Sequence, residues 1–553
     1  MTTRSARARL ARALCLLVLA ALAAAARAQD ANAPAYKISY TLSMPDPASH
    51  LFNVRVDVQG AGGAEYVDFQ MPRWSPGRYA VFEFAKNVQE AKAMRTCLPS
   101  DDCITNKLPV ERLDTQTWRV RTKAAGAAPD ARPVSFFYKV YADDLSGTFS
   151  QLDQRHANFN GGSVFVYVAG HKQDAVTLRI DAPKGWKIIN GQSKNTGQTE
   201  FGFANYDLLI DTPTEVAPDF NVETFEVGGK TYRVVVHSFG DEGGKRGELV
   251  KQVERVVRAE TALMPAPDYE QYTFLFHFDP TSPRGDGMEH LTSTQIVETS
   301  ALGAGNTLSD AVGAAAHEFF HVWNVKRLRP AGLGPWDFTR PVVTRGLWVA
   351  EGFTNYYGKL AHRRAGLWDD EQLLRAYSGA VGYIENQPGV HLTSAVEASV
   401  LAPFIDRASH DQKTNLPNVV VSYYPKGETI ALTLDLLIRG RTKGRASLDD
   451  VMRRAYTKFY LESPRDSYYL KGHAYAVEEF EGLASEVAGL DLSDFFRRYV
   501  HDTETLPYEE ALGYVGLRLT RTPEAARTTY RIEKDDKATP EALALREAWL
   551  NGK

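Results

Sequence analysis

Short runs in which apolar and polar residues alternate dominate the chain from Gln29 to about Asn221. A period of two places successive side chains on opposite faces, as in a half-buried strand. Turns rich in glycine and proline separate the runs, as in Trp74-Ser75-Pro76-Gly77. This pattern predicts a β-sandwich-like N-terminal domain over residues 29–221. The alternating runs lie at residues 36–40, 134–140, 164–168 and 176–180.

The pattern then changes to apolar residues spaced three and four apart. It predicts a strand at Thr231–His237, a helix at Gly247–Met264 and a buried strand at Tyr272–Phe278. Helical spacing continues to about Val500. Strands followed by helices predict a second domain, at residues 222–503, with a small sheet and a mainly helical half. The expected fold class is α+β and multidomain, because 553 residues are too many for one core.

Residues 504–553 are predicted to form a separate C-terminal tail. A short β-like stretch covers Tyr508 to Leu519, and a polar region follows it. The tail is expected to end in a helix from Pro540 to Leu550.

The first 28 residues are organised like a secretory signal peptide. A basic stretch (Arg4 to Arg12) precedes an apolar stretch (Ala13 to Ala26), and Ala26-Arg27-Ala28 matches a cleavage site. The apolar stretch is too short to span a bilayer comfortably. Cleavage after Ala28 predicts a periplasmic or secreted protein with no stable membrane insertion. An uncleaved anchor is the alternative.

Export changes the expectations for cysteines and for charge. Removal of the leader leaves Cys97 and Cys103, which are expected to form a small loop-closing disulfide in an oxidising compartment. It also removes five arginines and no acidic residue, so the formal charge falls from −4 to −9. Because the remaining lysines and arginines are scattered, a nucleic-acid partner is not expected.

The chemistry is concentrated in His317-Glu318-Phe319-Phe320-His321, an H-E-x-x-H pentapeptide. On a helix, residues four apart lie on one face, so His317 and His321 can bind one cation. Glu318 can then act as general base on a water molecule, as in zinc peptidases. The alternative is a chance match on a buried helix. The pentapeptide predicts one Zn²⁺ per chain.

A catalytic zinc site needs a third protein ligand and one open position. Glu351 is the candidate, because it is the only acid in the apolar stretch Leu347-Trp348-Val349-Ala350-Glu351-Gly352-Phe353-Thr354. A buried carboxylate is costly unless it is paired or binds a metal. The alternative is a glutamate that caps a helix or forms a surface salt bridge.

The segments His317–Arg327 and Leu347–Thr354 resemble the glycyl aminopeptidase family of gluzincin zinc metallopeptidases. Met71–Tyr79 and His156–Gly162 are similar to segments of that family's N-terminal β domain. The resemblance implies a thermolysin-like catalytic domain behind the β domain. It also implies a peptide substrate and removal of small N-terminal residues, Gly or Ala.

The resemblance also implies a tyrosine that stabilises the oxyanion of the tetrahedral intermediate. Tyr424 is the candidate, because Tyr424-Pro425-Lys426-Gly427 is similar to a Tyr-x-Lys-Gly element of related aminopeptidases. Its neighbour Tyr423 is the alternative assignment. An aromatic residue that merely packs at a helix start is the other alternative.

An exopeptidase must hold the free amine of its substrate, and Glu289 in Gly287-Met288-Glu289-His290 is suited to this task. The segment, with Gly287 and Met288, is expected to form a strand edge that binds the peptide backbone. It is similar to a Gly-x-Met-Glu-Asn element of aminopeptidases, with His290 in place of Asn. If Glu289 is only an edge-strand residue, the protein is expected to be an endopeptidase.

Two further expectations concern the rest of the chain. His237, His277 and His410 have no metal-ligand spacing and are expected to be structural or surface residues. Tyr508–Leu517 resembles the segment that leads into a PDZ domain in the family, but too few residues follow for a PDZ fold, so the tail is expected to be a remnant. A non-catalytic peptide-binding homologue remains a third alternative, although both histidines and both glutamates of the zinc motif are present.

Overall fold

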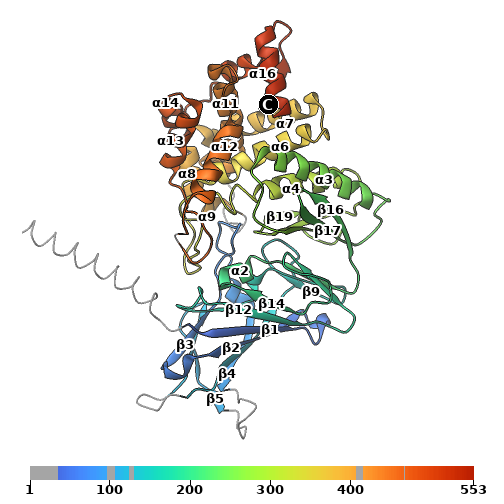
Figure 1. Cartoon of the computed structure of the whole chain (residues 1–553), viewed down its shortest axis with the longest axis vertical. Coiled ribbons are helices and arrows are strands. Elements are labelled where there is room, and N and C mark those ends of the chain that lie inside the picture. Colours follow the sequence, from blue (N-terminus) through green and yellow to red (C-terminus); the bar gives the residue numbers. More distant parts are fainter. Residues whose placement is uncertain (1–34, 96–105, 124–129, 407–414, 466, 553) are drawn as a thin grey trace, which may run out of the picture.

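The computed structural model describes residues 35–95, 106–123, 130–406, 415–465 and 467–552. The predicted signal peptide, the Cys97–Cys103 pair and His410 lie outside these described residues. Figure 1 shows a strand-rich N-terminal half below a second half, which combines a small sheet with many helices. The α+β multidomain fold is therefore confirmed. The exact domain limits stay predictions.

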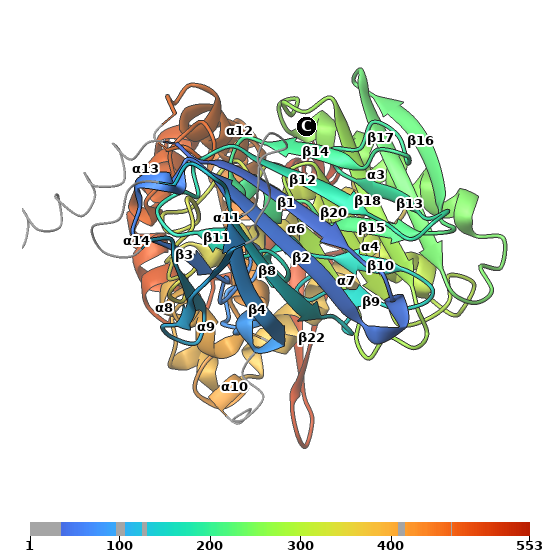
Figure 2. The same ribbon diagram turned by 90° about the horizontal axis from the view of Figure 1, so that it is seen from below.

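Three sheets form the described part of the N-terminal half. A seven-stranded sheet has the order β14-β12-β1-β2-β8-β4-β5, and two four-stranded sheets have the orders β11-β3-β7-β6 and β13-β15-β10-β9. Figure 2 shows β1, β2 and β8 side by side in the large sheet. The strands are β1 (Lys37–Ser43), β2 (Leu51–Gln59), β3 (Tyr66–Gln70), β4 (Val88–Arg95), β5 (Asn106–Leu108), β6 (Val110–Arg112), β7 (Thr117–Arg121), β8 (Val134–Tyr141), β9 (Gln151–Leu152), β10 (Ala157–Phe159), β11 (Tyr167–Val168), β12 (Val176–Asp181), β13 (Lys187–Asn190), β14 (Glu200–Phe203) and β15 (Thr214–Ala217).

The predicted alternation holds along most of these strands. In β2 every second side chain is buried, and these side chains form one face of the core. The predicted strand at residues 164–168 is largely wrong, because only Tyr167 and Val168 pair with β3. Residues 164–166 are fully buried instead, and the backbone oxygens of Val164 and Val166 accept hydrogen bonds from tyrosine side chains.

A five-stranded sheet with the order β16-β17-β18-β20-β19 opens the second half. Strands β17, β18 and β20 are parallel, whereas β19 runs antiparallel at one edge. Helices α3 and α4 pack against one another, and α4 also contacts β19 and β20. The elements are β16 (Asn221–Val227), β17 (Lys230–Ser238), α3 (Arg246–Leu263), β18 (Gln271–Phe278), β19 (Asp286–Glu289), β20 (Ser293–Glu298) and α4 (Thr307–Phe320).

The helical half is built around α11, which is buried along most of its length. Helix α6 lies against it at a glycine contact, because a Cβ on Gly352 would come within 2.3 Å of the Cα of Gly427. Only residues without side chains permit this approach. The helices are α5 (Leu347–Ala350), α6 (Gly352–Arg364), α7 (Asp370–Glu385), α8 (Ala395–Val400), α9 (Ala402–Ile405), α10 (Asn415–Asn418), α11 (Tyr423–Thr442), α12 (Leu448–Tyr456), α13 (Val477–Ala488) and α14 (Ser493–Phe496).

The C-terminal tail folds onto the helical half as α15 (Tyr508–Tyr514), the hairpin β21 (Leu517–Pro523) and β22 (Thr528–Lys534), and α16 (Pro540–Asn551). The β-like stretch expected from Tyr508 is wrong at its start, since α15 buries one apolar face there. The predicted final helix is present, and its Trp549 is fully buried with its indole N–H donating to Tyr356. No helix among the described residues is long and apolar enough to cross a membrane.

The two halves share a core. Trp74 from the N-terminal half packs against Trp336 and Phe338 from the loop after α4, with ring centroids 5.4 and 5.1 Å apart. The same apolar cluster includes Leu347 and Ala350 of α5. The N-terminal half is therefore packed directly against the segments that carry the predicted zinc ligands.

Candidate active site

The pentapeptide lies at the end of α4, next to the edge of the five-stranded sheet. The helix ends at Phe320, and the following turn retains a helical conformation at His321. The two imidazoles therefore stay on one side, with the Nε2 atoms of His317 and His321 3.0 Å apart. The two imidazole rings therefore point to a common position.

Glu351 completes a three-residue cluster with the two histidines. It lies at the junction of α5 and α6 and is only 2% exposed. Its Oε2 is 3.5 Å from His317 Nε2 and 3.4 Å from His321 Nε2. Bond lengths of about 2.0–2.1 Å to a tetrahedral zinc place neighbouring ligand atoms about 3.3 Å apart. The three donor atoms therefore fit one zinc ion.

Neighbouring groups orient these side chains. The Nδ1 of His321 lies 2.7 Å from the backbone oxygen of Asn324, so it donates there and leaves Nε2 free to bind a metal. The hydroxyl of Tyr79 donates to Oε1 of Glu351 over 2.5 Å. Tyr79 belongs to the N-terminal half, so that half contributes a group that contacts a candidate metal ligand.

Electrostatics couple the three groups. Burial opposes ionisation of Glu351, but the adjacent His321 and His317 hold its pKa well below the ordinary value. Conversely, burial opposes protonation of His321, and the Glu351 carboxylate raises its pKa above the ordinary value. The site therefore favours a carboxylate with positive charge beside it, which is the arrangement that a divalent cation also satisfies.

Glu318 lies beside strand β19. A Cβ on Gly287 would come within 2.2 Å of Glu318 Oε1, so glycine is required for this close approach. Burial raises the pKa of Glu318 to about 8, and the nearby Glu289 and Glu351 act in the same direction. A divalent cation at the three ligands would lower this pKa by stabilising the carboxylate. The group can therefore exchange a proton near neutral pH.

The two tyrosines at the start of α11 differ in position. Tyr424 is partly exposed, and its ring centroid lies 6.3 Å from that of His317. Tyr423 is 1% exposed and packs edge-on against Tyr79. Of the two residues, Tyr424 therefore has the better position for contact with a substrate.

Glu289 ends β19 beside the same cluster. Ligand atoms of Glu289, Glu318 and His321 lie within 4.8 Å of one another. Gly77 packs closely against Glu289, since a Cβ there would lie 2.8 Å from Oε2. The side chain of Met288 also contacts the N-terminal half, because Cβ atoms on Gly77 or Gly147 would clash with it. Its neighbour His290 contacts Asp211.

A small cavity adjoins Glu289. It has a volume of about 10 Å³, which is the space of about one water molecule. Gly77, Tyr79, Trp336 and Tyr469 are among the residues that line it. The space beside the candidate amine-binding carboxylate is therefore narrow.

Sequence reasoning missed the roles of Arg78 and Tyr79. Arg78 donates to Asp286 over 2.6 Å, at the start of the strand that ends in Glu289. The segment Trp74-Ser75-Pro76-Gly77-Arg78-Tyr79 resembled the family, but no local pattern indicated that it reaches the catalytic residues. Its unusual run of proline, glycine and aromatic residues was the only signal.

Comparisons with known proteins agree with this geometry. Residues 39–218 match the Peptidase M61 N-terminal domain, and residues 310–430 match the M61 glycyl aminopeptidase family. A crystal structure of an aminopeptidase N family protein from Idiomarina loihiensis is similar, with 26% identity, a TM-score of 0.76, and coverage of 88% of this chain and 79% of that chain. An M1 zinc metallopeptidase from Deinococcus radiodurans shares the fold, with 13% identity, a TM-score of 0.50, and coverage of 86% and 95%. No curated protein matched.

Proposed function

Because the chain belongs to the M61 glycyl aminopeptidase family and is a zinc metallopeptidase, we propose that it is an exported aminopeptidase that removes small N-terminal residues from peptides. The observation that carries the proposal is the position of Glu289 beside Glu318 and His321. A carboxylate there can pair with the ammonium group of a peptide whose first carbonyl lies at the catalytic residues.

We assign one zinc ion to His317, His321 and Glu351. When bound, zinc polarises the scissile carbonyl and lowers the pKa of water to about 7. Glu318 takes a proton from the attacking water and delivers it to the leaving amine. The Tyr424 hydroxyl donates to the oxygen that becomes negatively charged. The backbone of Gly287 and Met288 in β19 offers an edge along which the peptide extends.

We also propose that the first side chain of the substrate enters the small cavity beside Glu289, which would favour Gly or Ala. A cavity of about 10 Å³ leaves little room for a side chain larger than a methyl group. Trp336 and Tyr469 form part of its wall and pack against each other, and Trp336 also packs against Trp74.

Export is proposed from the leader at residues 1–28. The expected mature protein begins at Gln29 and is found in the periplasm or outside the cell. Mass spectrometry of the N-terminal peptide in each cellular fraction checks this expectation, and an intact leader on the active protein would contradict it.

The test of aminopeptidase action is Glu289→Gln, assayed on a glycyl peptide and on its N-acetylated form. The wild type should cleave only the free-amine peptide. Because a charge-assisted contact contributes about 1.5–3 kcal/mol, the variant should lose roughly 10- to 100-fold in kcat/KM on that peptide. Efficient cleavage of the acetylated peptide by the wild type would instead indicate an endopeptidase on the same site.

A further inference from the structure

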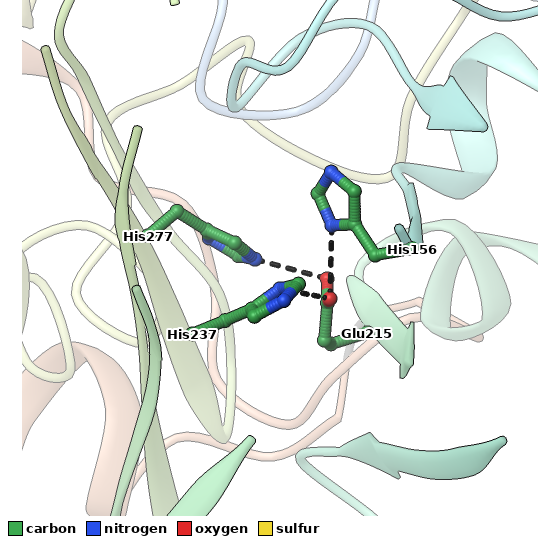
Figure 3. A group of neighbouring side chains, drawn as sticks. All are labelled: His156, Glu215, His237 and His277. Atoms are coloured by element: carbon green, nitrogen blue, oxygen red, sulfur yellow. Dashed lines mark hydrogen bonds and ion pairs between the residues drawn. The ribbon is translucent and has the colours of Figure 1, made fainter. Parts of the chain in front are cut away.

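A second cluster of histidines lies away from the active site, between the N-terminal half and the five-stranded sheet of the second half. It consists of His156, Glu215, His237 and His277, and Figure 3 shows the three rings around the Glu215 carboxylate. All four residues are at most 3% exposed. His156 directly precedes β10 and Glu215 lies on β15, whereas His237 and His277 are register partners on β17 and β18.

Each imidazole places one nitrogen on the carboxylate. Oε1 of Glu215 lies 3.0 Å from His156 Nδ1 and 2.7 Å from His237 Nδ1. Oε2 lies 2.9 Å from His277 Nε2 and also accepts a hydrogen bond from the Asn158 amide. The sequence-based expectation that His237 and His277 are structural or surface histidines was incomplete, because the fold unites them with His156 around one acid.

Hydrogen bonds alone do not fully account for these contacts. His156 faces an oxygen at both ring nitrogens, since its Nε2 lies 2.9 Å from Gln151 Oε1. A neutral imidazole has only one N–H, so with the Gln151 amide oriented as here the second contact needs an extra proton or a cation. The Nδ1 atom of His237 lies 2.7 Å from the Glu215 carboxylate, but this contact does not have the angles of a hydrogen bond. This nitrogen has no other hydrogen-bond partner in the described part of the chain.

The charges in the cluster are compatible with a bound cation. One buried carboxylate compensates only one imidazolium, and further buried positive charge is costly. Neutral imidazoles that direct their lone pairs at a shared divalent ion replace the proton by metal–ligand bonds, with one net positive charge in the cluster. The four donor atoms lie within 4.8 Å of one another. The nitrogen–oxygen contacts of 2.7–3.0 Å are slightly shorter than the spacing of about 3.3 Å between the ligand atoms of a tetrahedral zinc site, so the side chains would move slightly apart around an ion.

We propose that His156, Glu215, His237 and His277 form a second, structural metal site that binds a divalent transition-metal ion, zinc above all. Imidazole and carboxylate ligands suit zinc, and four protein ligands close the coordination sphere. Gln151 and Asn158 hold His156 and Glu215 from outside, as second partners do in metal sites.

The ion would tie the two halves together. Glu215 lies on β15 and His156 directly precedes β10 of the same sheet, whereas His237 and His277 lie on β17 and β18 of the five-stranded sheet. The contacts of Glu215 with His237 and His277 therefore join the two sheets. A small apolar cluster also joins these sheets, at Ile189, Ala217, Phe220, Val235 and Leu275. Because Asn158 contacts both Glu215 and Gln295 of β20, the site is linked to the strand that pairs with β19.

The test is the metal content of the full-length mature enzyme after dialysis in metal-free buffer, measured by inductively coupled plasma mass spectrometry. The wild type should retain two equivalents per chain. His237→Gln should retain one equivalent, and so should the double variant His317→Ala/His321→Ala. X-ray absorption of that double variant should show imidazole ligands at about 2.0–2.1 Å.

His362→Gln is the matched control, because His362 is a buried histidine outside both clusters, and it should retain two equivalents. A single equivalent in the wild type that disappears with His317 and His321 would overturn the proposal. A second equivalent that persists in His237→Gln would also overturn it, because that metal would be bound elsewhere. If His237→Gln does not fold, His277→Asn replaces it in the test and should also retain one equivalent, compared with two in the wild type.

Discussion

At the scale of single residues, Tyr79 shows how the N-terminal half bears on the catalytic chemistry. Its hydroxyl donates to Oε1 of Glu351, while Oε2 faces the two histidines. A hydrogen bond on the outer oxygen fixes which oxygen is turned to the metal and holds the carboxylate in place. Burial, together with the Glu351 and Glu289 carboxylates, raises the pKa of Tyr79 well above its ordinary value, so the hydroxyl stays a donor.

We therefore predict that Tyr79→Phe weakens zinc binding and lowers kcat/KM by about 10- to 100-fold. Competition with a zinc chelator, followed by activity, measures both effects. Tyr40→Phe is the control, because Tyr40 is a buried tyrosine of the same half whose hydroxyl donates to Val166. It should leave zinc affinity unchanged. If Tyr79→Phe and the wild type were equally sensitive to the chelator, Tyr79 would not be needed to position Glu351.

The residues that could be predicted from the sequence are those whose geometry is local. His317, Glu318 and His321 lie within five positions of one another, so helical spacing alone brings them together. Glu351 was found because an acid stood alone in an apolar stretch. Tyr79 lies 272 positions before Glu351, and nothing in its surroundings revealed this contact. The ligands of the second cluster are likewise scattered along the chain, and only the packing of two sheets unites them.

At the scale of elements, helix α3 carries a buried acid without a partner. Glu260 is 1% exposed, and neither carboxylate oxygen has a hydrogen-bond partner in the described part of the chain. Burial raises its pKa well above the ordinary value. The folded state therefore accepts the protonated form, whereas the unfolded chain ionises near its ordinary pKa. The contribution of Glu260 to the free energy of unfolding is therefore greatest below the ordinary pKa of the unfolded chain. It is lost as the pH rises toward the raised pKa of the folded state.

Replacement of this acid should stabilise the enzyme in a pH-dependent manner. Glu260→Met removes the ionisable group and keeps a similar volume, so the free energy of unfolding should rise by about 1–3 kcal/mol at pH 8. Urea unfolding at pH 5 and pH 8 measures the difference, which should be larger at pH 8. Glu248→Met, at an exposed position of the same helix, should show no such pH dependence. An equal effect at both pH values would show that Glu260 is not protonated in the fold.

Element types were predictable where one face is buried and the run is long. The helix predicted at Gly247–Met264 and the strand at Tyr272–Phe278 match α3 and β18 closely. The failures occurred in short apolar runs, where strand and helix patterns overlap. Residues 508–514 form α15 because Tyr508, Ala511 and Leu512 are three and four apart and face the helical half.

At the scale of the whole molecule, the active site is completed across the two halves. The segment that carries Gly77, Arg78 and Tyr79 enters between the edge strand β19 and the start of α6. Gly77 fits against Met288 and Glu289, where any side chain would clash. The second half carries the candidate catalytic residues, but the N-terminal half therefore helps to form the space beside Glu289, the candidate amine-binding residue.

The ion pair between Arg78 and Asp286 tests this dependence directly. The two side chains are 9% and 3% exposed, and Asp286 also accepts the backbone N–H of Gly147. Arg78→Met leaves a buried charge without its main counter-ion, so the free energy of unfolding should fall by about 3–5 kcal/mol. The double variant Arg78→Met/Asp286→Asn should regain part of this loss, because no uncompensated charge remains. KM for a glycyl peptide should stay raised in both variants, since β19 has lost its contacts with Arg78 of the N-terminal half. A double variant with normal KM would show that Arg78 does not position the substrate strand.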